Sequence, residues 1–179
     1  MFGNVVDDTA DLVTKPTIKI NSIYVPDSDY EYGTKVSSVT VNLSSNAGSY
    51  KYGPTVTGGA FSGNYTLSGT GFTTKNNSSS SSQAVSLSST FTVGKSNSIT
   101  LSASRAYNAA TNTAESKLGG TTTQSYTSGT ATDSKTFNPT ANFYQYFAVT
   151  SGSSTTAPTS GTKLTEKIKD YTTTAAERV

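Results

Sequence analysis

Residues 85–104, VSLSSTFTVGKSNSITLSAS, decide the fold. Apolar residues alternate with Ser and Thr, a turn containing Gly94 follows, and a second alternating run begins. The apolar positions are Val85, Leu87, Phe91, Val93, Ile99, Leu101 and Ala103. A repeat of two residues is typical of a strand with one buried and one exposed face. The stretch therefore predicts a β-hairpin whose outer face carries hydroxyl groups.

Similar but shorter runs predict the other strands. They are Thr17–Val25, Val36–Leu43, Ser49–Tyr52, Asn64–Phe72 and Asn142–Thr150. Residues 75–82, KNNSSSSS, predict a loop, whereas 108–139 is too long for one and predicts a weak strand near 122–128. About seven to nine short strands between turns favour an all-β, immunoglobulin-like β-sandwich, with a jelly roll or small barrel as the alternative.

The sandwich is expected at 17–150, with an N-terminal arm at 1–16 and a linker and tail at 151–179. The arm is either a frayed terminus or a short helix ended by Pro16. The apolar side of that helix would hold Val5, Val6, Ala10, Leu12 and Val13. In the tail, Leu164, Ile168 and Tyr171 follow helical spacing and predict a short helix that needs a docking surface.

The composition argues against an enzyme. The chain of 179 residues has no histidine, cysteine or tryptophan, while Ser and Thr make up about a third of it. Histidine and cysteine are the commonest sources of acid–base, nucleophilic and metal chemistry, so no catalytic, cofactor or metal residue is assigned. A net charge of +2 without a basic run gives no support for nucleic-acid binding. No stretch approaches the ~20 apolar residues of a membrane span, and the N-terminus lacks the pattern of a signal peptide.

One acidic cluster has the residue types of a cation site. Asp27, Asp29 and Glu31 occupy alternate positions, so in an extended segment their carboxylates share one face. Oxygen ligands of this kind suit Ca²⁺, but the spacing is not that of an EF-hand loop. The alternative is a solvated acidic turn before a strand.

Two similar motifs, each with a pair of tyrosines, occur twenty residues apart. Tyr30 and Tyr32 flank Glu31, and Tyr50 and Tyr52 flank Lys51. The four rings either fill the core of a leucine-poor chain or form an aromatic platform for sugars or peptides. The platform favours a carbohydrate- or cell-surface-binding module of an adhesin, with a host-surface glycan as ligand. The two charged residues are expected to pair across strands.

The last predicted strand is aromatic on both faces. It contains the run FYQYF, residues 143–147. A strand of a one-sided sheet needs only one apolar face, so the surplus face predicts contact with another subunit or protein. The alternative is coverage by residues 108–139 or by the tail.

Several short motifs carry a family resemblance. They are Tyr30–Thr34, Val39–Val41, Tyr52–Gly53, Phe91–Gly94 and Phe143–Phe147. Across residues 17–157 the chain resembles immunoglobulin-like domains in virion proteins of tailed bacteriophages, of the head-fibre, decoration or tail-associated type. The resemblance implies a non-enzymatic structural protein, made in the host cytoplasm without a signal peptide and released by lysis. It also implies an oligomer whose partners are other capsid or tail proteins.

Overall fold

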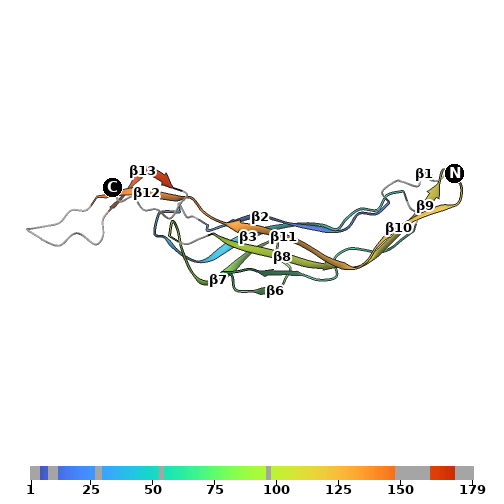
Figure 1. Ribbon diagram of the computed structural model, residues 1–179, viewed down its shortest axis with the longest axis horizontal. Coiled ribbons are helices and arrows are strands. Elements are labelled where there is room, and N and C mark those ends of the chain that lie inside the picture. Colours follow the sequence, from blue (N-terminus) through green and yellow to red (C-terminus); the bar gives the residue numbers. More distant parts are fainter. Residues whose placement is uncertain are drawn as a thin grey trace, which may run out of the picture.

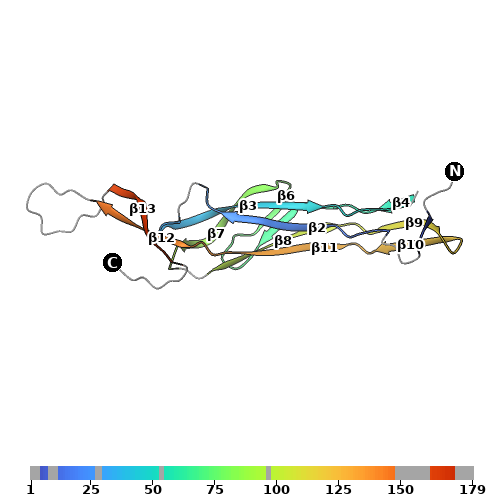
Figure 2. The same cartoon turned by 90° about the horizontal axis from the view of Figure 1, so that it is seen from above.

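The chain folds into an elongated rod of β-strands. The computed structural model describes residues 5–7, 12–26, 30–52, 55–95, 98–147 and 162–171, and none of these is helical. The strands are β1 (Val5–Val6), β2 (Thr17–Tyr24), β3 (Lys35–Asn46), β4 (Thr55–Gly58), β5 (Tyr65–Ser68), β6 (Lys75–Ser78), β7 (Ser82–Thr92), β8 (Ile99–Tyr107), β9 (Ala110–Ser116), β10 (Thr121–Tyr126), β11 (Gly129–Phe137), β12 (Ala141–Phe147) and β13 (Thr162–Tyr171). Figure 1 and Figure 2 both place β9 and β10 at one end of the rod and β12 and β13 at the other. The prediction of an all-β chain is confirmed.

Two sheets pack face to face in the middle of the rod, as in a β-sandwich. One has the strand order β2-β3-β7 and the other β11-β8-β5-β6. Their inner faces supply one hydrophobic cluster, because apolar residues alternate with polar ones along most of these strands. Its largest fully buried members are Ile20, Val39, Val41, Leu67, Val85, Val93 and Leu101.

The strands at 85–93 and 99–104 are present with the predicted buried faces, but the predicted hairpin between them is wrong. β7 pairs with β3, whereas β8 pairs with β5 and β11 in the opposite sheet. The turn after Val93 therefore carries the chain across the core from one sheet to the other. Alternation fixes which face a strand buries, and both sheets bury the same kind of face, so the pattern alone does not choose the partner.

The two sheets also meet along one side. The edge strands β2 and β11 lie close together there, and the Asp133 carboxylate accepts a hydrogen bond of 2.7 Å from the Ile20 amide. A bulge between Ile20 and Ser22 interrupts the pairing of β2 with β3 at this point. The carboxylate thus satisfies a backbone donor of one sheet from the edge of the other.

Residues 99–137 form a single long hairpin with its turn at 117–120. β8 pairs with β11 and β9 pairs with β10 in one unbroken register, from Ile99 opposite Phe137 to Glu115 opposite Thr121. The predicted weak strand near 122–128 is present as β10, but 108–139 also holds the whole of β9 and β11. At ~3.3 Å per residue, the arm from Ile99 to Ser116 spans roughly 55 Å, so the ribbon links the sandwich to the end of the rod.

Three further predictions need correction. Lys75–Ser78 forms strand β6 against β5, although the loop prediction covered 75–82. Val5–Val6 is a short strand, not the start of a helix. Leu164, Ile168 and Tyr171 lie in strand β13, so the C-terminal helix is also wrong. Two helical turns have little stability of their own, whereas pairing with β12 satisfies backbone groups along one edge of each strand.

Candidate functional site: the tip of the rod

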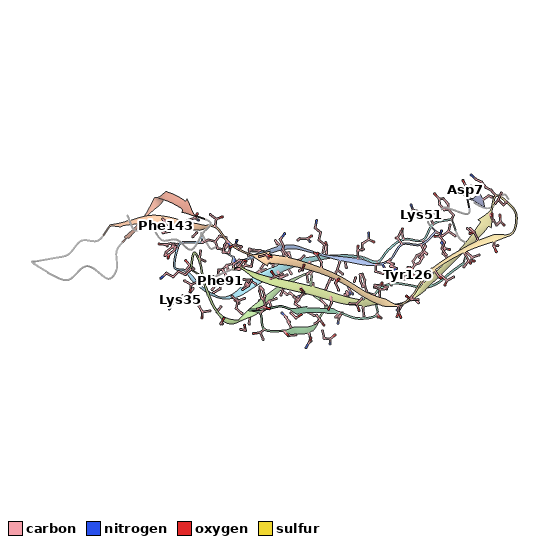
Figure 3. All side chains as sticks on the ribbon, viewed as in Figure 1. Asp7, Lys35, Lys51, Phe91, Tyr126 and Phe143 are labelled. Carbon is pink, nitrogen blue, oxygen red and sulfur yellow. The ribbon has the colours of Figure 1, made fainter. Side chains whose placement is uncertain are left out.

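The end of the rod that carries β1 is built from separate parts of the chain. We call it the tip, and it comprises β1, residues 12–16, the excursion at 47–63 with β4, and the β9–β10 end of the long hairpin. β9 is its central strand, since β10 pairs with one edge while β4 and β1 share the other. Figure 3 shows Asp7, Lys51 and Tyr126 in this region, far from Phe91 and Phe143.

Leu12 is the anchor of the N-terminal arm. Its side chain is fully buried and clusters with Ala114 of β9. Its amide donates to the Gln124 side-chain oxygen at 2.7 Å, and its carbonyl accepts from the Lys51 amide at 3.0 Å. This part of the arm is therefore ordered, and the frayed-terminus alternative does not describe it.

Asn112 ties the three segments together. Its side chain is fully buried on the inner side of β9. The amide nitrogen donates to the Leu12 carbonyl at 2.8 Å and to the Lys51 carbonyl at 3.0 Å. Its side-chain oxygen meets no hydrogen-bond donor among the described residues. A buried amide that donates to two separate segments of the chain acts as a polar cross-link in a region with few apolar residues.

A group of tyrosines forms the base of the tip. The Tyr50 and Tyr126 hydroxyls lie 3.5 Å apart, and the Tyr107 ring meets the Tyr126 ring edge-on with centroids 5.8 Å apart. Burial, reinforced by the neighbouring Tyr50 hydroxyl, raises the pKa of Tyr126 to about 12. Gly59, at φ +89°, lies so close to the Tyr50 phenol that a Cβ there would overlap its oxygen. This glycine is required for the ring to reach Tyr126.

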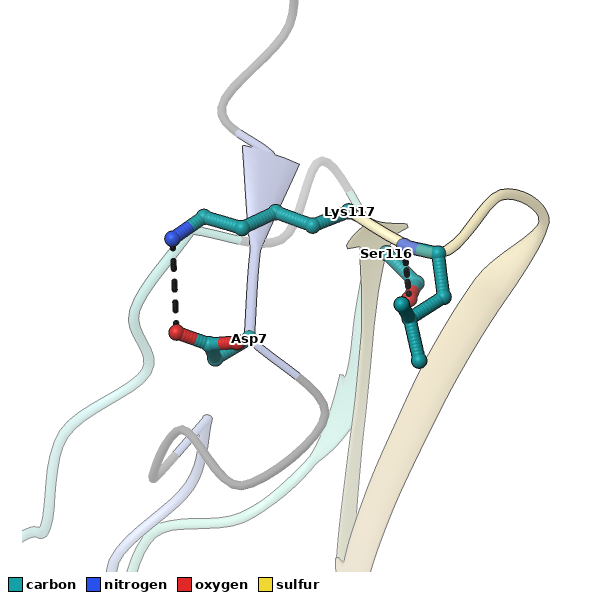
Figure 4. Close-up of polar contacts among 4 residues, drawn as sticks. Asp7, Ser116 and Lys117 are labelled. Atoms are coloured by element: carbon teal, nitrogen blue, oxygen red, sulfur yellow. Dashed lines mark hydrogen bonds and ion pairs between the residues drawn. The ribbon is translucent and has the colours of Figure 1, made fainter.

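Few interactions hold strand β1 at the outer end of the tip. β1 pairs in parallel with only Glu115 and Ser116. Figure 4 shows an ion pair between Lys117 Nζ and the Asp7 carboxylate at 3.3 Å. Both side chains are more than half exposed, so solvent screens the pair.

Large apolar side chains are also exposed at the tip. Among the side chains that the structure describes, the large exposed hydrophobic ones are Val5, Tyr52 and Leu118, with exposed fractions of 45%, 51% and 85%. Leu118 stands in the turn of the long hairpin, where its amide donates to Ser116 Oγ at 3.1 Å. Apolar exposure concentrated at one place marks a candidate interaction surface.

The four tyrosines of the predicted aromatic platform do not come together. Tyr30 and Tyr32 lie at the β12 end of the sandwich, where Tyr32 stacks on Phe143 at 4.8 Å. Tyr50 and Tyr52 belong to the tip. Glu31 forms a bridge with Asn142 of β12, so Glu31 and Lys51 lie at opposite ends and do not pair.

The remaining predicted residues give no site. Asp27 and Asp29 lie outside the described residues, and no group of three acidic, His or Cys side chains that could hold a metal occurs within them. Of the aromatic strand, Phe143 packs against the core and β13 pairs with the strand's edge, while the side chains of 144–147 lie outside the description. The part of the chain that the structure describes contains no helix long and apolar enough to cross a membrane.

The outer face of β5, β8 and β11 carries hydroxyl groups in rows. The registers align Thr66, Ser104 and Thr132, then Ser68, Ser102 and Ser134, then Thr100 and Thr136. A shallow groove of about 480 Å³ runs over the first two of these rows. Its lining contains no charged side chain apart from Asp133, which is engaged with the Ile20 amide.

No protein-family model, curated protein or solved structure matches this chain. The sequence reasoning missed Asn112, Gln124 and Leu118, which lie within the polar stretch 108–139. An Asn and a Gln in an otherwise Ser- and Thr-rich run were the available signal, because their longer amide side chains reach a neighbouring backbone.

Proposed function

We propose that the protein is a non-enzymatic structural component of a bacteriophage virion, a capsid fibre or decoration protein that assembles with other virion proteins. The observation that carries the proposal is the rod itself. One hairpin keeps a single register from the sandwich to the tip, which makes the two parts a continuous strut (Figure 2). A strut with distinct surfaces at its two ends suits a protein that holds partners apart or projects from a particle.

The strand order supports an immunoglobulin-like assignment for the sandwich. The sandwich has seven strands, which are in chain order β2, β3, β5, β6, β7, β8 and β11. The first, second and fifth of them form one sheet. The other holds the third, sixth and seventh, as in the immunoglobulin fold. The fourth strand, β6, pairs with β5, whereas in constant-type domains it joins the opposite sheet. In this scheme the excursion at 47–63 and the β9–β10 hairpin are the loops that cluster at one end of the sandwich, the end that antibodies use for binding.

The surface supports exposure in an assembly. Ser and Thr occupy most outward positions of β7, β8 and β11, and charged residues are scarce there. Hydroxyl groups keep a face hydrated without strong charge. A protein of this kind is made in the host cytoplasm and leaves the cell by lysis.

The test is a mass-spectrometric inventory of purified phage particles, followed by binding of the recombinant chain to particles that lack it. We expect the chain in the particles, and we expect a variant lacking residues 1–7 to fold but bind less. Truncation at residue 7 is preferable to removal of 1–16, because Leu12 is part of the folded tip. A chain absent from particles and unable to bind them would contradict the proposal.

The alternative is a carbohydrate- or cell-surface-binding module of an adhesin. Its predicted platform is divided between the two ends of the rod, so the hydroxyl-lined groove on β5, β8 and β11 is the surface that would take a neutral glycan. Binding on a glycan array that is lost in Ser102→Lys, with folding intact, would favour this alternative. The matched control is Ser86→Lys, on the outer face of the other sheet.

A further inference from the structure

We propose that strand β1 is exchanged between two copies of this chain, giving a tip-to-tip dimer in which each copy's β1 pairs with the other's β9. This inference concerns the isolated chain and does not depend on the proposed virion role. It follows from how the arm is held, how far its chain reaches and which side chains the tip leaves exposed.

The arm has a fixed part and a loosely held part. Leu12 is fully buried and forms hydrogen bonds with Gln124, Lys51 and Asn112. β1, by contrast, pairs through two residues, and the ion pair between Asp7 and Lys117 beside it is exposed to solvent. A short parallel pairing at a sheet edge is readily replaced by an equivalent strand.

The length of the chain limits where an exchanged β1 can go. Five peptide steps separate Asp7 from Leu12, so β1 reaches at most roughly 17 Å from its anchor. It can therefore pair only with a β9 that lies beside its own tip. The arrangement of two copies that satisfies both arms is a symmetric one with the tips in contact and the sandwiches pointing apart.

The exposed apolar side chains supply the driving force. In one copy alone, Leu118 and Val5 remain in contact with water at the tip. Exchange reproduces the pairing of β1 with Glu115 and Ser116 and adds burial of these side chains between two tips. β4 pairs with the same edge of β9, but from Ala110 to Thr113. It therefore does not compete with β1 for residues 115 and 116.

Because the chain has no cysteine, disulfide trapping gives a clean test. Val5 and Glu115 are directly paired across strands about 4.8 Å apart, which suits a disulfide. We expect oxidised Val5→Cys/Glu115→Cys to give a cross-linked monomer at low concentration and a covalent dimer at high concentration. When the two single variants, distinguished by mass, are mixed, the disulfide should join position 5 of one copy to position 115 of the other in preference to like pairs.

Two controls make the outcome decisive. Thr113→Cys/Thr123→Cys joins two strands of one hairpin and should give monomer at every concentration. Light scattering of the unmodified chain should show a dimer that Leu118→Ser weakens by about tenfold and that loss of residues 1–7 abolishes. Monomer alone at all concentrations, or a dimer indifferent to both changes, would overturn the proposal.

Discussion

Replacing Asn112 with alanine should weaken the attachment of residues 12–16 to the rest of the tip while leaving the sandwich folded. The variant removes the two hydrogen bonds that the side-chain amide donates to the Leu12 and Lys51 carbonyls. The Leu12 carbonyl keeps the Lys51 amide as a donor, so the principal loss falls on the Lys51 carbonyl. The side-chain oxygen, which meets no donor among the described residues, disappears with the amide and offsets part of the loss.

Each such hydrogen bond is worth about 1 kcal/mol, so the upper limit of the loss is about 2 kcal/mol. Hydrogen exchange measures this directly at the Leu12 and Lys51 amides, both of which are hydrogen-bonded within the clamp. A loss of about 2 kcal/mol corresponds to roughly 30-fold faster exchange there. The matched control is Asn64→Ala, which removes an exposed amide contact to Asn77 on the sandwich and should leave these two amides unchanged.

Asn112→Asp separates hydrogen bonding from packing, because it keeps the shape and removes the donor. At neutral pH a buried carboxylate would face two carbonyl oxygens, which costs more than the alanine change. Burial raises the folded-state pKa of such a carboxyl, so its stability recovers as the pH falls toward ~3.9, the unfolded value. If neither variant changes the rate of hydrogen exchange at the Leu12 amide, the idea that Asn112 holds the arm is refuted.

Other changes test the packing and titration of the same region. Gly59→Ala places a methyl group against a phenol oxygen at a left-handed backbone position, and thermal unfolding should show a loss of about 3–4 kcal/mol. Gly119→Ala has a similar φ but open space around it, so only about 1–2 kcal/mol should be lost; equal losses would argue against the clash. The free energy of unfolding should fall between about pH 10 and 12, because the Tyr126 phenol ionises at a lower pH in the unfolded chain than in the folded one. Tyr126→Phe should reduce the slope of that fall by up to ~1.4 kcal/mol per pH unit. Arg105→Lys should cost about 1–2 kcal/mol, since its guanidinium lies 4.2 Å and 4.9 Å from two aromatic ring centres; no change in the midpoint of urea unfolding would contradict that role.

The sequence predicted the faces of strands better than their partners. Leu87 and Leu101 are buried as their alternation required, yet they belong to opposite sheets. A period of two reports only which side of a strand meets the core. The choice between a hairpin and a crossing of the core depends on how the later strands β8 and β11 close the second sheet, and that information lies far along the chain.

The sequence pattern did not predict the long hairpin, because the buried positions change from odd-numbered to even-numbered residues between β8 and β9. In β8 the odd-numbered Leu101 and Ala103 are buried, whereas in β9 the even-numbered Ala110, Asn112 and Ala114 are buried. The register with the returning strand does not change, so the ribbon presents its opposite face to the protein at the tip. A search for continuous alternation through 99–116 fails at this change of face, and the strand at 110–116 was therefore not predicted.

The tip also shows how a chain poor in leucine can order a small structure. The apolar cluster that holds the arm consists of Leu12 and Ala114, too little to hold separate segments by hydrophobic burial alone. Two side-chain amides, on Asn112 and Gln124, instead bond directly to the backbone of the arm. Such bonds depend on geometry, and the long hairpin provides that geometry by extending an already stable ribbon out of the sandwich. The polar composition therefore does not weaken the rod evenly: it leaves the end beyond the amide clamp, at β1, as the part most open to exchange with a partner.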